Sequence, residues 1–130
     1  MNQDLDILDY SKAIEQNPDS AEAYKRRGGA YYSKHDFDSA IADYTKAIEL
    51  DPGDADAYNI RGKTYTLKRD YGNAMADYTQ AIKLNPGDAN AYIIRGNAYA
   101  SINYYDYDSA IADYTKAIEL ECVVNRFWPI

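Results

Sequence analysis

The chain has 130 residues, enough for one domain, and its 14 basic and 21 acidic side chains give a net charge of −7. This balance argues against nucleic-acid binding, which needs clustered lysine and arginine, and against docking on anionic lipid. The apolar runs are too short to span a bilayer. Tyrosine accounts for 15 residues, and its apolar ring with a polar tip suits half-buried surfaces.

Cysteine and the N-terminal segment bear on compartment and metal content. Cys122 is the single cysteine, so neither an intrachain disulfide nor a cysteine-based zinc site can form. The first four residues lack the basic and apolar regions of a secretory signal. We therefore expect a cytoplasmic protein that holds no metal and no cofactor.

The dominant pattern is an internal repeat, and Pro18, Pro52 and Pro86 mark its constant period. The same period carries Tyr24, Tyr58 and Tyr92; Gly28, Gly62 and Gly96; Tyr31, Tyr65 and Tyr99; and Ala13, Ala47 and Ala81. A fixed period of this size predicts a repeat solenoid. In such folds the function is normally carried by a surface that several repeats build together.

Each period is expected to form two helices. Tyr24, Gly28 and Tyr31 are spaced by four and three residues, so they share one helical face, and Ala40 and Tyr44 begin a second such pattern. A polar break separates the two halves. The expected helices lie at about 4–16, 21–34, 38–50, 55–68, 72–84, 89–102 and 108–120.

The first expected helix belongs to an incomplete repeat. Residues 9–14 align with residues 43–48 of a second helix, so the chain opens with half a repeat. Ser20, Asp54 and Asp88 stand directly before the next first helices, where their side chains can act as N-caps.

The third repeat is longer than the others. Ala40 and Ala74 lie one full period apart, whereas Ala110 comes two positions later than the same period predicts from Ala74. The two extra residues fall within 102–106, the expected turn between helices. An insertion in a turn is tolerated because it leaves the apolar helix faces in register.

These positions carry a resemblance to the tetratricopeptide repeat family. The matching residues are Tyr24, Gly28, Tyr31, Ala40, Tyr44, Ala47 and Pro52 in the first full repeat, Tyr58, Gly62, Tyr65, Ala74, Tyr78, Ala81 and Pro86 in the second, and Tyr92, Gly96, Tyr99, Ala110, Tyr114 and Ala117 in the third. Cys122 stands where the third proline would fall. The resemblance implies an all-α, right-handed α-solenoid of three repeats plus an N-terminal half-repeat. It divides the chain into 1–19, 20–54, 55–88, 89–122 and an apolar C-terminal tail or cap, 123–130.

Two recurring features point to the inside of the solenoid. Glycine within a helix costs about 1 kcal/mol relative to alanine, so recurring helical glycines suggest that helices approach closely there, with tyrosines filling the larger gaps.

Charged residues recur as well. Arg27, Arg61 and Arg95 recur before these glycines, and Asp9, Asp43, Asp77 and Asp113 recur before the second-helix tyrosines. Our hypothesis is that they form Arg–Asp pairs between helices. The alternative is that both rows are solvated and contribute little.

No constellation for catalysis is visible. His35 is the single histidine and lies in an expected turn. The nucleophile-elbow, P-loop and dinucleotide-binding motifs are missing, and no carboxylate pair stands out for acid–base work. We therefore predict that the chain is not an enzyme; a hydrolase or transferase remains an alternative if it is a fragment of a larger one.

The resemblance implies that the first helix of each repeat lines a concave groove. Side chains off the tyrosine–glycine face form the predicted groove: Glu22, Lys25, Gly29, Tyr32, Asp56, Asn59, Ile60, Lys63, Thr66, Asn90, Ile93, Ile94 and Asn97. Asparagines can hydrogen-bond a peptide backbone, and the isoleucines form an apolar patch. A family subtype clamps the C-terminal carboxylate of chaperone tails, and Lys25 matches its first lysine. Gly29, Ile60, Asn90 and Ile94 depart from the other clamp positions, so we predict no such clamp.

The leading prediction is a non-catalytic scaffold that binds a protein or peptide segment in this groove. The C-terminal tail supports an alternative. Val123, Val124, Phe127 and Trp128 abandon the repeat pattern and either cap the last repeat or contact another chain. In the second case the molecule is a structural homo-oligomerisation module that assembles through this tail and the N-terminal half-repeat.

Overall fold

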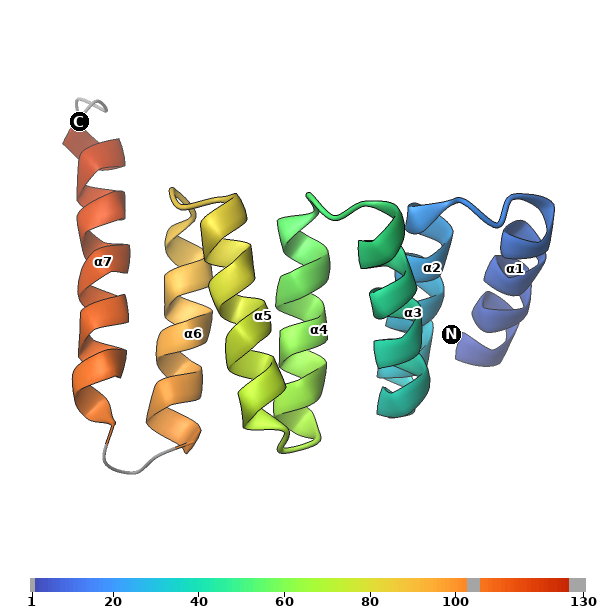
Figure 1. Ribbon diagram of the computed structural model, residues 1–130, viewed down its shortest axis with the longest axis horizontal. Coiled ribbons are helices and arrows are strands. Elements are labelled where there is room, and N and C mark those ends of the chain that lie inside the picture. Colours follow the sequence, from blue (N-terminus) through green and yellow to red (C-terminus); the bar gives the residue numbers. More distant parts are fainter. Residues whose placement is uncertain (1, 103–105, 127–130) are drawn as a thin grey trace.

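The computed structural model describes residues 2–102 and 106–126, with side chains described for 2–101 and 106–122. These residues form seven helices and no strand (Figure 1). The helices are α1 (Gln3–Gln16), α2 (Ala21–Ser33), α3 (Phe37–Leu50), α4 (Ala55–Leu67), α5 (Tyr71–Leu84), α6 (Ala89–Ile102) and α7 (Tyr107–Arg126). The predicted all-helical solenoid is confirmed.

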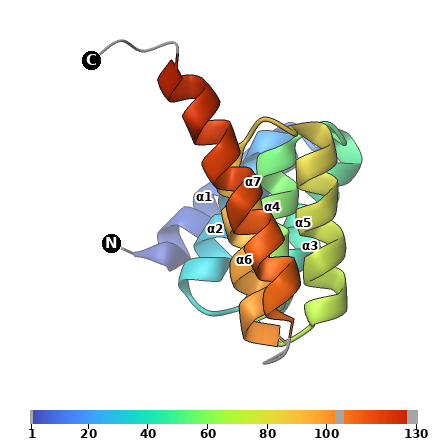
Figure 2. The same ribbon diagram turned by 90° about the vertical axis from the view of Figure 1, so that its left-hand side faces the viewer.

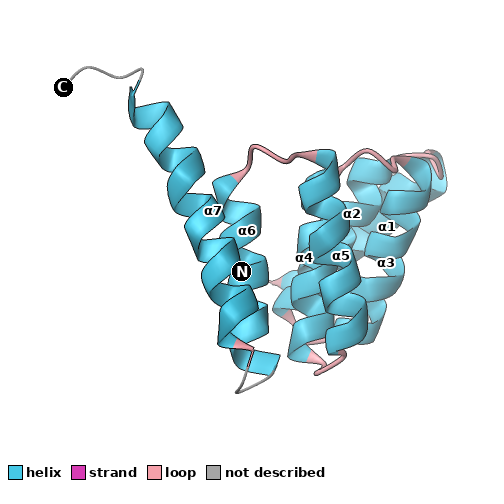
Figure 3. Cartoon of the chain, turned by 60° about the vertical axis from the view of Figure 1, so that its left-hand side comes forward, coloured by secondary structure: helices cyan, strands magenta, loops and turns pink. Residues whose placement is uncertain are grey.

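The helices stand in a row in chain order, with α1 and α7 at opposite ends (Figure 1). Each helix packs on the helices that precede and follow it in sequence, and short loops join the helices from α1 to α6 (Figure 3). The pairs α2–α3, α4–α5 and α6–α7 each form a helical hairpin. Helix α1 has no hairpin partner before it, and its main packing partner is α2. We call α2, α4 and α6 first helices and α1, α3, α5 and α7 second helices.

The helix ends follow from local hydrogen bonds. Ser20 Oγ accepts from the Ala23 N–H at 3.2 Å, and Asp54 caps α4 in the same way at 3.2 Å. Asp88 Oδ1 accepts from the Asn90 N–H at 3.0 Å, so all three predicted caps are confirmed. The second helices α3, α5 and α7 are capped by aspartates that sequence reasoning did not single out: Asp36, Asp70 and Asp106.

Helix α7 is the longest element. Its predicted end at residue 120 is too early, because the helix continues to Arg126. This last part projects past the ends of the other helices (Figure 2). Val123 and Val124 lie in these final turns, where side chains are not described, and Phe127 and Trp128 lie outside the described residues. Residues 103–105, which contain part of the predicted insertion, also lie outside them.

The core forms where each first helix meets its second helix. Ala40, Tyr44 and Ala47 of α3 are at most 1% exposed. A Cβ placed on Gly28 would lie 2.7 Å from Cε1 of Tyr44, and the same contact recurs at Gly62–Tyr78 and Gly96–Tyr114. These distances are below van der Waals contact, so any larger residue at these positions would collide with the tyrosine ring. The predicted close approach is confirmed.

Candidate functional site

An ion pair links the two helices of each repeat. Nε and Nη2 of Arg61 on α4 donate to the two carboxylate oxygens of Asp77 on α5, at 2.8 and 2.7 Å. Arg27–Asp43 and Arg95–Asp113 repeat this two-pronged geometry at 2.7 to 2.8 Å. The predicted Arg–Asp pairs are therefore confirmed, and the solvated alternative is wrong for these three pairs.

Each arginine also reaches a third helix. Nη1 of Arg61 donates to Thr45 Oγ1 on α3 at 3.2 Å, so this guanidinium joins α3, α4 and α5. Arg27 makes the same contact with Ser11, and Arg95 makes it with Thr79. The guanidinium groups also lie over first-helix tyrosine rings, with the Arg61 carbon 5.6 Å from the Tyr58 ring centre.

The pairs are well shielded from water. The Arg61 side chain is 16% exposed and that of Asp77 is 6% exposed. The hydrogen bond that Arg61 donates to Asp77 raises the pKa of Arg61 against the opposing effect of burial. Such groups hold neighbouring helices at a fixed spacing and orientation, so their role is to position the surface that the first helices present.

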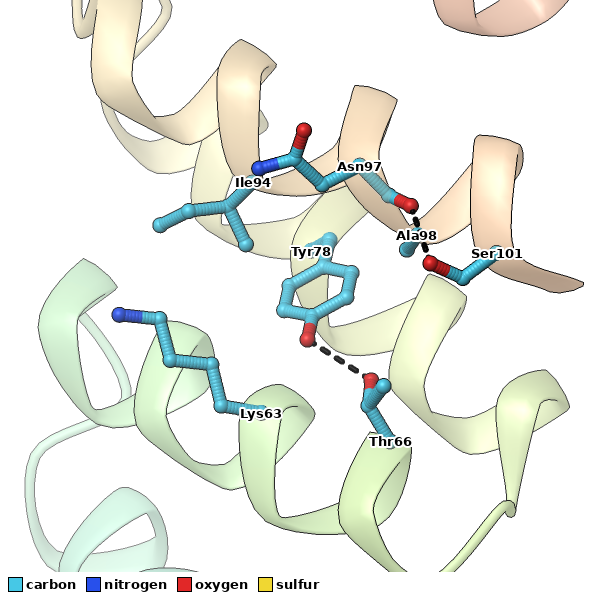
Figure 4. Close-up of a pocket in the computed structure, with 7 residues that line it drawn as sticks. All are labelled: Lys63, Thr66, Tyr78, Ile94, Asn97, Ala98 and Ser101. Atoms are coloured by element: carbon cyan, nitrogen blue, oxygen red, sulfur yellow. Dashed lines mark hydrogen bonds between the residues drawn. The ribbon is translucent and has the colours of Figure 1, made fainter. Parts of the chain in front are cut away.

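That surface contains an open cavity of about 200 Å³ between α4 and α6 (Figure 4). It is lined by Lys63, Thr66, Tyr78, Ile94, Asn97, Ala98 and Ser101. The structure thus brings together four predicted groove residues: Lys63, Thr66, Ile94 and Asn97. The cavity is smaller than the roughly 300–1,000 Å³ of small-molecule sites, so it has room for a side chain rather than for a cofactor.

The polar groups of this cavity are fixed by internal hydrogen bonds. The hydroxyls of Tyr78 and Thr66 lie 2.9 Å apart (Figure 4). The Tyr114 hydroxyl donates to Oδ1 of Asn97 at 2.5 Å, which leaves the Asn97 amide N–H groups as donors. Lys63 is exposed and forms no ion pair with another described residue. The cavity therefore offers two donors, the Lys63 ammonium and the Asn97 amide, beside the apolar Ile94.

The α2 end of the predicted groove differs from the α4–α6 cavity because its charged side chains are already paired. Lys25 Nζ donates to Asp54 at 2.8 Å, which raises the pKa of Lys25. Burial tends to raise the pKa of Asp54, but the Lys25 ammonium and the Ala57 N–H outweigh it, and the pKa lies below its ordinary value. Glu22 is held by Arg26 at 3.0 Å. The charges at this end are satisfied within the chain, so it offers fewer free groups than the α4–α6 cavity.

The remaining predicted groove residues are spread along the same helices. Gly29, Tyr32, Ile60 and Ile93 are partly buried, and Asp56 and Asn90 are exposed. Asn59 is 8% exposed, and its Oδ1 has no hydrogen-bond partner among the described residues. The structure therefore turns this amide inward and does not present it on the groove surface.

Sequence reasoning missed three residues that line the cavity. Tyr78 was assigned to the core, and its ring is buried, but its hydroxyl points into the cavity (Figure 4). Ala98 and Ser101 follow Ile94 by four and seven residues, which places them on the same helical face. Helical spacing from Ile94 was therefore sufficient to predict both residues as part of the groove.

The described residues contain no group of three or more histidine, cysteine, aspartate or glutamate side chains placed to hold a metal ion. Nor does any helix in that part of the chain have both the length and the apolar character to cross a membrane.

The Arg–Asp pairs and glycine–tyrosine contacts between the two helices of each repeat form what we call the inner seam. Stacked helical hairpins with this repeated seam define the class of the protein as a helical-repeat protein. The chain belongs to the tetratricopeptide repeat family, whose model matches residues 21–54 and 55–88. Members of this family generally mediate protein–protein interactions and are generally non-catalytic. No curated protein matches the chain.

Several solved structures are similar to it. A crystal structure of MamA is 30% identical, with a TM-score of 0.86, and the match covers 92% of this chain and 69% of that chain. The first tetratricopeptide domain of Spaghetti (RPAP3), bound to the HSP90 peptide SRMEEVD, is 30% identical with a TM-score of 0.71, covering 78% and 79%. The Arabidopsis OM64 tetratricopeptide domain is 31% identical with a TM-score of 0.71, covering 78% and 82%.

Proposed function

We propose that the chain is a non-catalytic scaffold that binds an extended peptide segment across α4 and α6. The observation that carries this proposal is the cavity in which Lys63 and Asn97 present hydrogen-bond donors beside Ile94. Two donors next to an apolar wall fit a segment that places an apolar side chain beside a carbonyl or carboxylate group. A similar solved domain holds a peptide in its structure, which supports this class of ligand.

The rigidity of the site favours binding. The Arg61–Asp77 and Arg95–Asp113 pairs fix the second and third repeats, so the cavity exists before a ligand arrives. A preformed site loses less conformational entropy on binding than a flexible one.

A peptide library displayed against the intact chain tests the proposal, followed by calorimetry on the selected peptides. We expect the combined Lys63→Ala, Ile94→Asp and Asn97→Ala changes to weaken binding at least about tenfold, because hot-spot groups carry most of the affinity. Lys46→Ala, an exposed lysine on α3, is the matched control and should bind normally. Peptides that bind the triple variant as well as the native chain would contradict the assignment.

Self-association is the second candidate, and α7 favours it. Ile118 is 62% exposed, whereas Ile48 and Ile82 at the same repeat position are 7% and 8% exposed. Ile111 and Tyr107, further towards the start of the helix, are 58% and 54% exposed. An apolar stripe of this kind favours association with a second copy. Sedimentation over a concentration series, with Ile111→Asp plus Ile118→Asp as the disrupted variant, separates this candidate from a monomeric scaffold.

A further inference from the structure

The hydroxyl of Tyr44 is a buried hydrogen-bonding group without a partner. Tyr44 is 1% exposed, and its hydroxyl makes no hydrogen bond to any described residue. Burial raises the pKa of Tyr44 to about 12, so the hydroxyl keeps its proton at neutral pH and remains a donor. Buried polar groups in folded proteins are nearly always hydrogen-bonded, so an exception points to a function or to a missing ligand.

The third repeat shows what such a hydroxyl binds. There the Tyr114 hydroxyl donates to Oδ1 of Asn97 at 2.5 Å, so a neutral side-chain amide is its acceptor. Gly29 stands at the position of Asn97 in the first repeat. The first repeat therefore keeps the donor, Tyr44, and lacks the side chain that would accept from it.

The missing side chain leaves space beside the hydroxyl, and we call this space the Gly29–Tyr44 site. A Cβ placed on Gly29 would lie 3.9 Å from the Tyr44 hydroxyl oxygen, and no atom of another helix in the described part of the chain lies nearer. An acceptor that enters here reaches a normal hydrogen-bond length of about 2.8 Å by moving about 1 Å further in. The site therefore has room for a small polar group.

Tyr32 can act as the cover of this site. It stands at the position of Thr66, whose hydroxyl lies 2.9 Å from that of Tyr78, so the Tyr32 side chain begins beside the Tyr44 hydroxyl. Burial is the main cause of the raised pKa of Tyr44, and the Tyr32 phenol group adds to it. Tyr32 is partly exposed, so its ring can turn towards solvent when a ligand enters.

The charges around the site favour a neutral acceptor over a carboxylate. Lys25 and Arg27 of α2 are engaged by Asp54 and Asp43, at 2.8 Å in each case. After burial and Tyr32, Asp43 also adds to the raised pKa of Tyr44, so a further negative charge is disfavoured beside the hydroxyl. Burying a charge without a partner is costly, whereas a carboxamide oxygen needs only the hydrogen bond.

We propose that the Gly29–Tyr44 site binds the side-chain carboxamide of an asparagine or glutamine in the peptide segment that occupies the α4–α6 cavity. The carboxamide oxygen accepts from the Tyr44 hydroxyl, as Oδ1 of Asn97 accepts from Tyr114 in the third repeat. This inference rests on the proposed function, because it concerns the same segment. It adds a second requirement to the ligand: a neutral amide at the α2 end, in addition to the apolar side chain beside Ile94.

The probes are the peptides that the displayed library yields on the native chain, each compared with a derivative in which leucine replaces its asparagine or glutamine. Calorimetry should show binding about fivefold weaker for the leucine derivative and for Tyr44→Phe, because each change removes one hydrogen bond. Gly29→Asn should weaken binding by at least as much, since the chain's own amide then fills the site.

Both variants should remain folded, because Tyr44→Phe removes a group without a partner and Gly29→Asn supplies one. Tyr24→Phe is the matched control. It removes a hydroxyl from another tyrosine of the first repeat, on the tyrosine–glycine face of α2 and outside the groove, and should leave binding unchanged.

The outcomes separate this inference from the proposed function. Peptides that lose affinity in the Lys63, Ile94 and Asn97 variant but bind Tyr44→Phe as tightly as the native chain would refute the inference alone. Peptides that lose affinity only in Tyr44→Phe would support the Gly29–Tyr44 site and contradict the proposed function. A library that yields no peptide, or peptides that bind every variant equally, would contradict both. An aspartate derivative that binds more tightly than the asparagine peptide would make the occupant a carboxylate and would also refute the inference.

Discussion

The inner seam is nearly identical in the three repeats, whereas the surface above it differs from repeat to repeat. In the seam, the arginine fork and the glycine–tyrosine contact recur in each repeat with nearly equal distances. At the surface, the tips of the same tyrosines have three different environments. The Tyr78 hydroxyl meets Thr66, the Tyr114 hydroxyl donates to Asn97, and the buried Tyr44 hydroxyl has no partner among the described residues.

The first-helix residues next to each tyrosine hydroxyl explain why the three hydroxyls have different environments. Asn97 corresponds to Gly29 in the first repeat, and Thr66 corresponds to Tyr32, so neither of those polar partners exists above Tyr44. Burial raises the pKa of Tyr44 to about 12. The seam therefore specifies the fold and is the same in each repeat, while the surface above it differs from repeat to repeat.

Removing the seam carboxylate of the second repeat gives the largest expected effect. Asp77→Ala leaves Arg61 shielded from water without its partner, which costs about 3 kcal/mol of unfolding free energy. Urea denaturation followed by circular dichroism measures this loss. Exchanging both residues for apolar ones of similar size should restore most of the stability, because neither charge is then left alone. If Asp77→Ala behaves like the exposed-site control Glu119→Ala, the ion pair does not support the seam.

Crowding the glycine contact is the next test. In Gly62→Ala, the new Cβ would lie 2.6 Å from Cε1 of the buried Tyr78 ring. Overpacking of this kind costs about 1–3 kcal/mol, which outweighs the helix-propensity gain of about 1 kcal/mol. Gly72→Ala is the matched control, since no atom lies within 4 Å of its Cβ position. Thermal melting should show a lower midpoint for Gly62→Ala alone, and an equal or higher midpoint would show that the ring can move aside.

The smallest expected effect is a gain in stability from a change at the surface of the first repeat. Gly29→Asn copies Asn97 and gives the Tyr44 hydroxyl an acceptor, worth about 1 kcal/mol together with the better helix propensity of asparagine. The Cβ position on Gly29 lies 3.9 Å from that hydroxyl, so there is space for the side chain.

A double-mutant cycle with Tyr44→Phe isolates the hydrogen bond. In the phenylalanine background, Gly29→Asn should keep only its propensity gain. An identical gain in both backgrounds would mean that asparagine does not reach the hydroxyl.

The fold could be predicted from the sequence because its determinants recur. A single Arg–Asp pair would be weak evidence, but the spacing of Arg27 and Asp43 is repeated by Arg61 and Asp77, and chance does not maintain such spacing. The periodicity also placed the helices to within a few residues, apart from the end of α7, since the residues that cap the first helices recur with it.

The candidate site could be predicted only in part, for a geometric reason. Helical spacing shows that Asn59 and Lys63 are neighbours on α4, but whether a side chain faces open space depends on how closely the neighbouring helices pack beside it. The structure buries Asn59 and leaves Lys63 exposed. Tyr78 was missed as a cavity residue because its ring and its hydroxyl have different environments, and a residue-level pattern does not separate them.

The third contact of each arginine bears on how the molecule unfolds. Nη1 of Arg61 binds Thr45 in the preceding repeat while its fork holds Asp77 in its own. When one repeat unfolds, the arginine of the next repeat loses a hydrogen-bond partner while its guanidinium remains shielded from water. The energetic coupling between neighbouring repeats is therefore strong. The complete repeats are therefore expected to melt in one cooperative transition, with little fraying of single hairpins from either end.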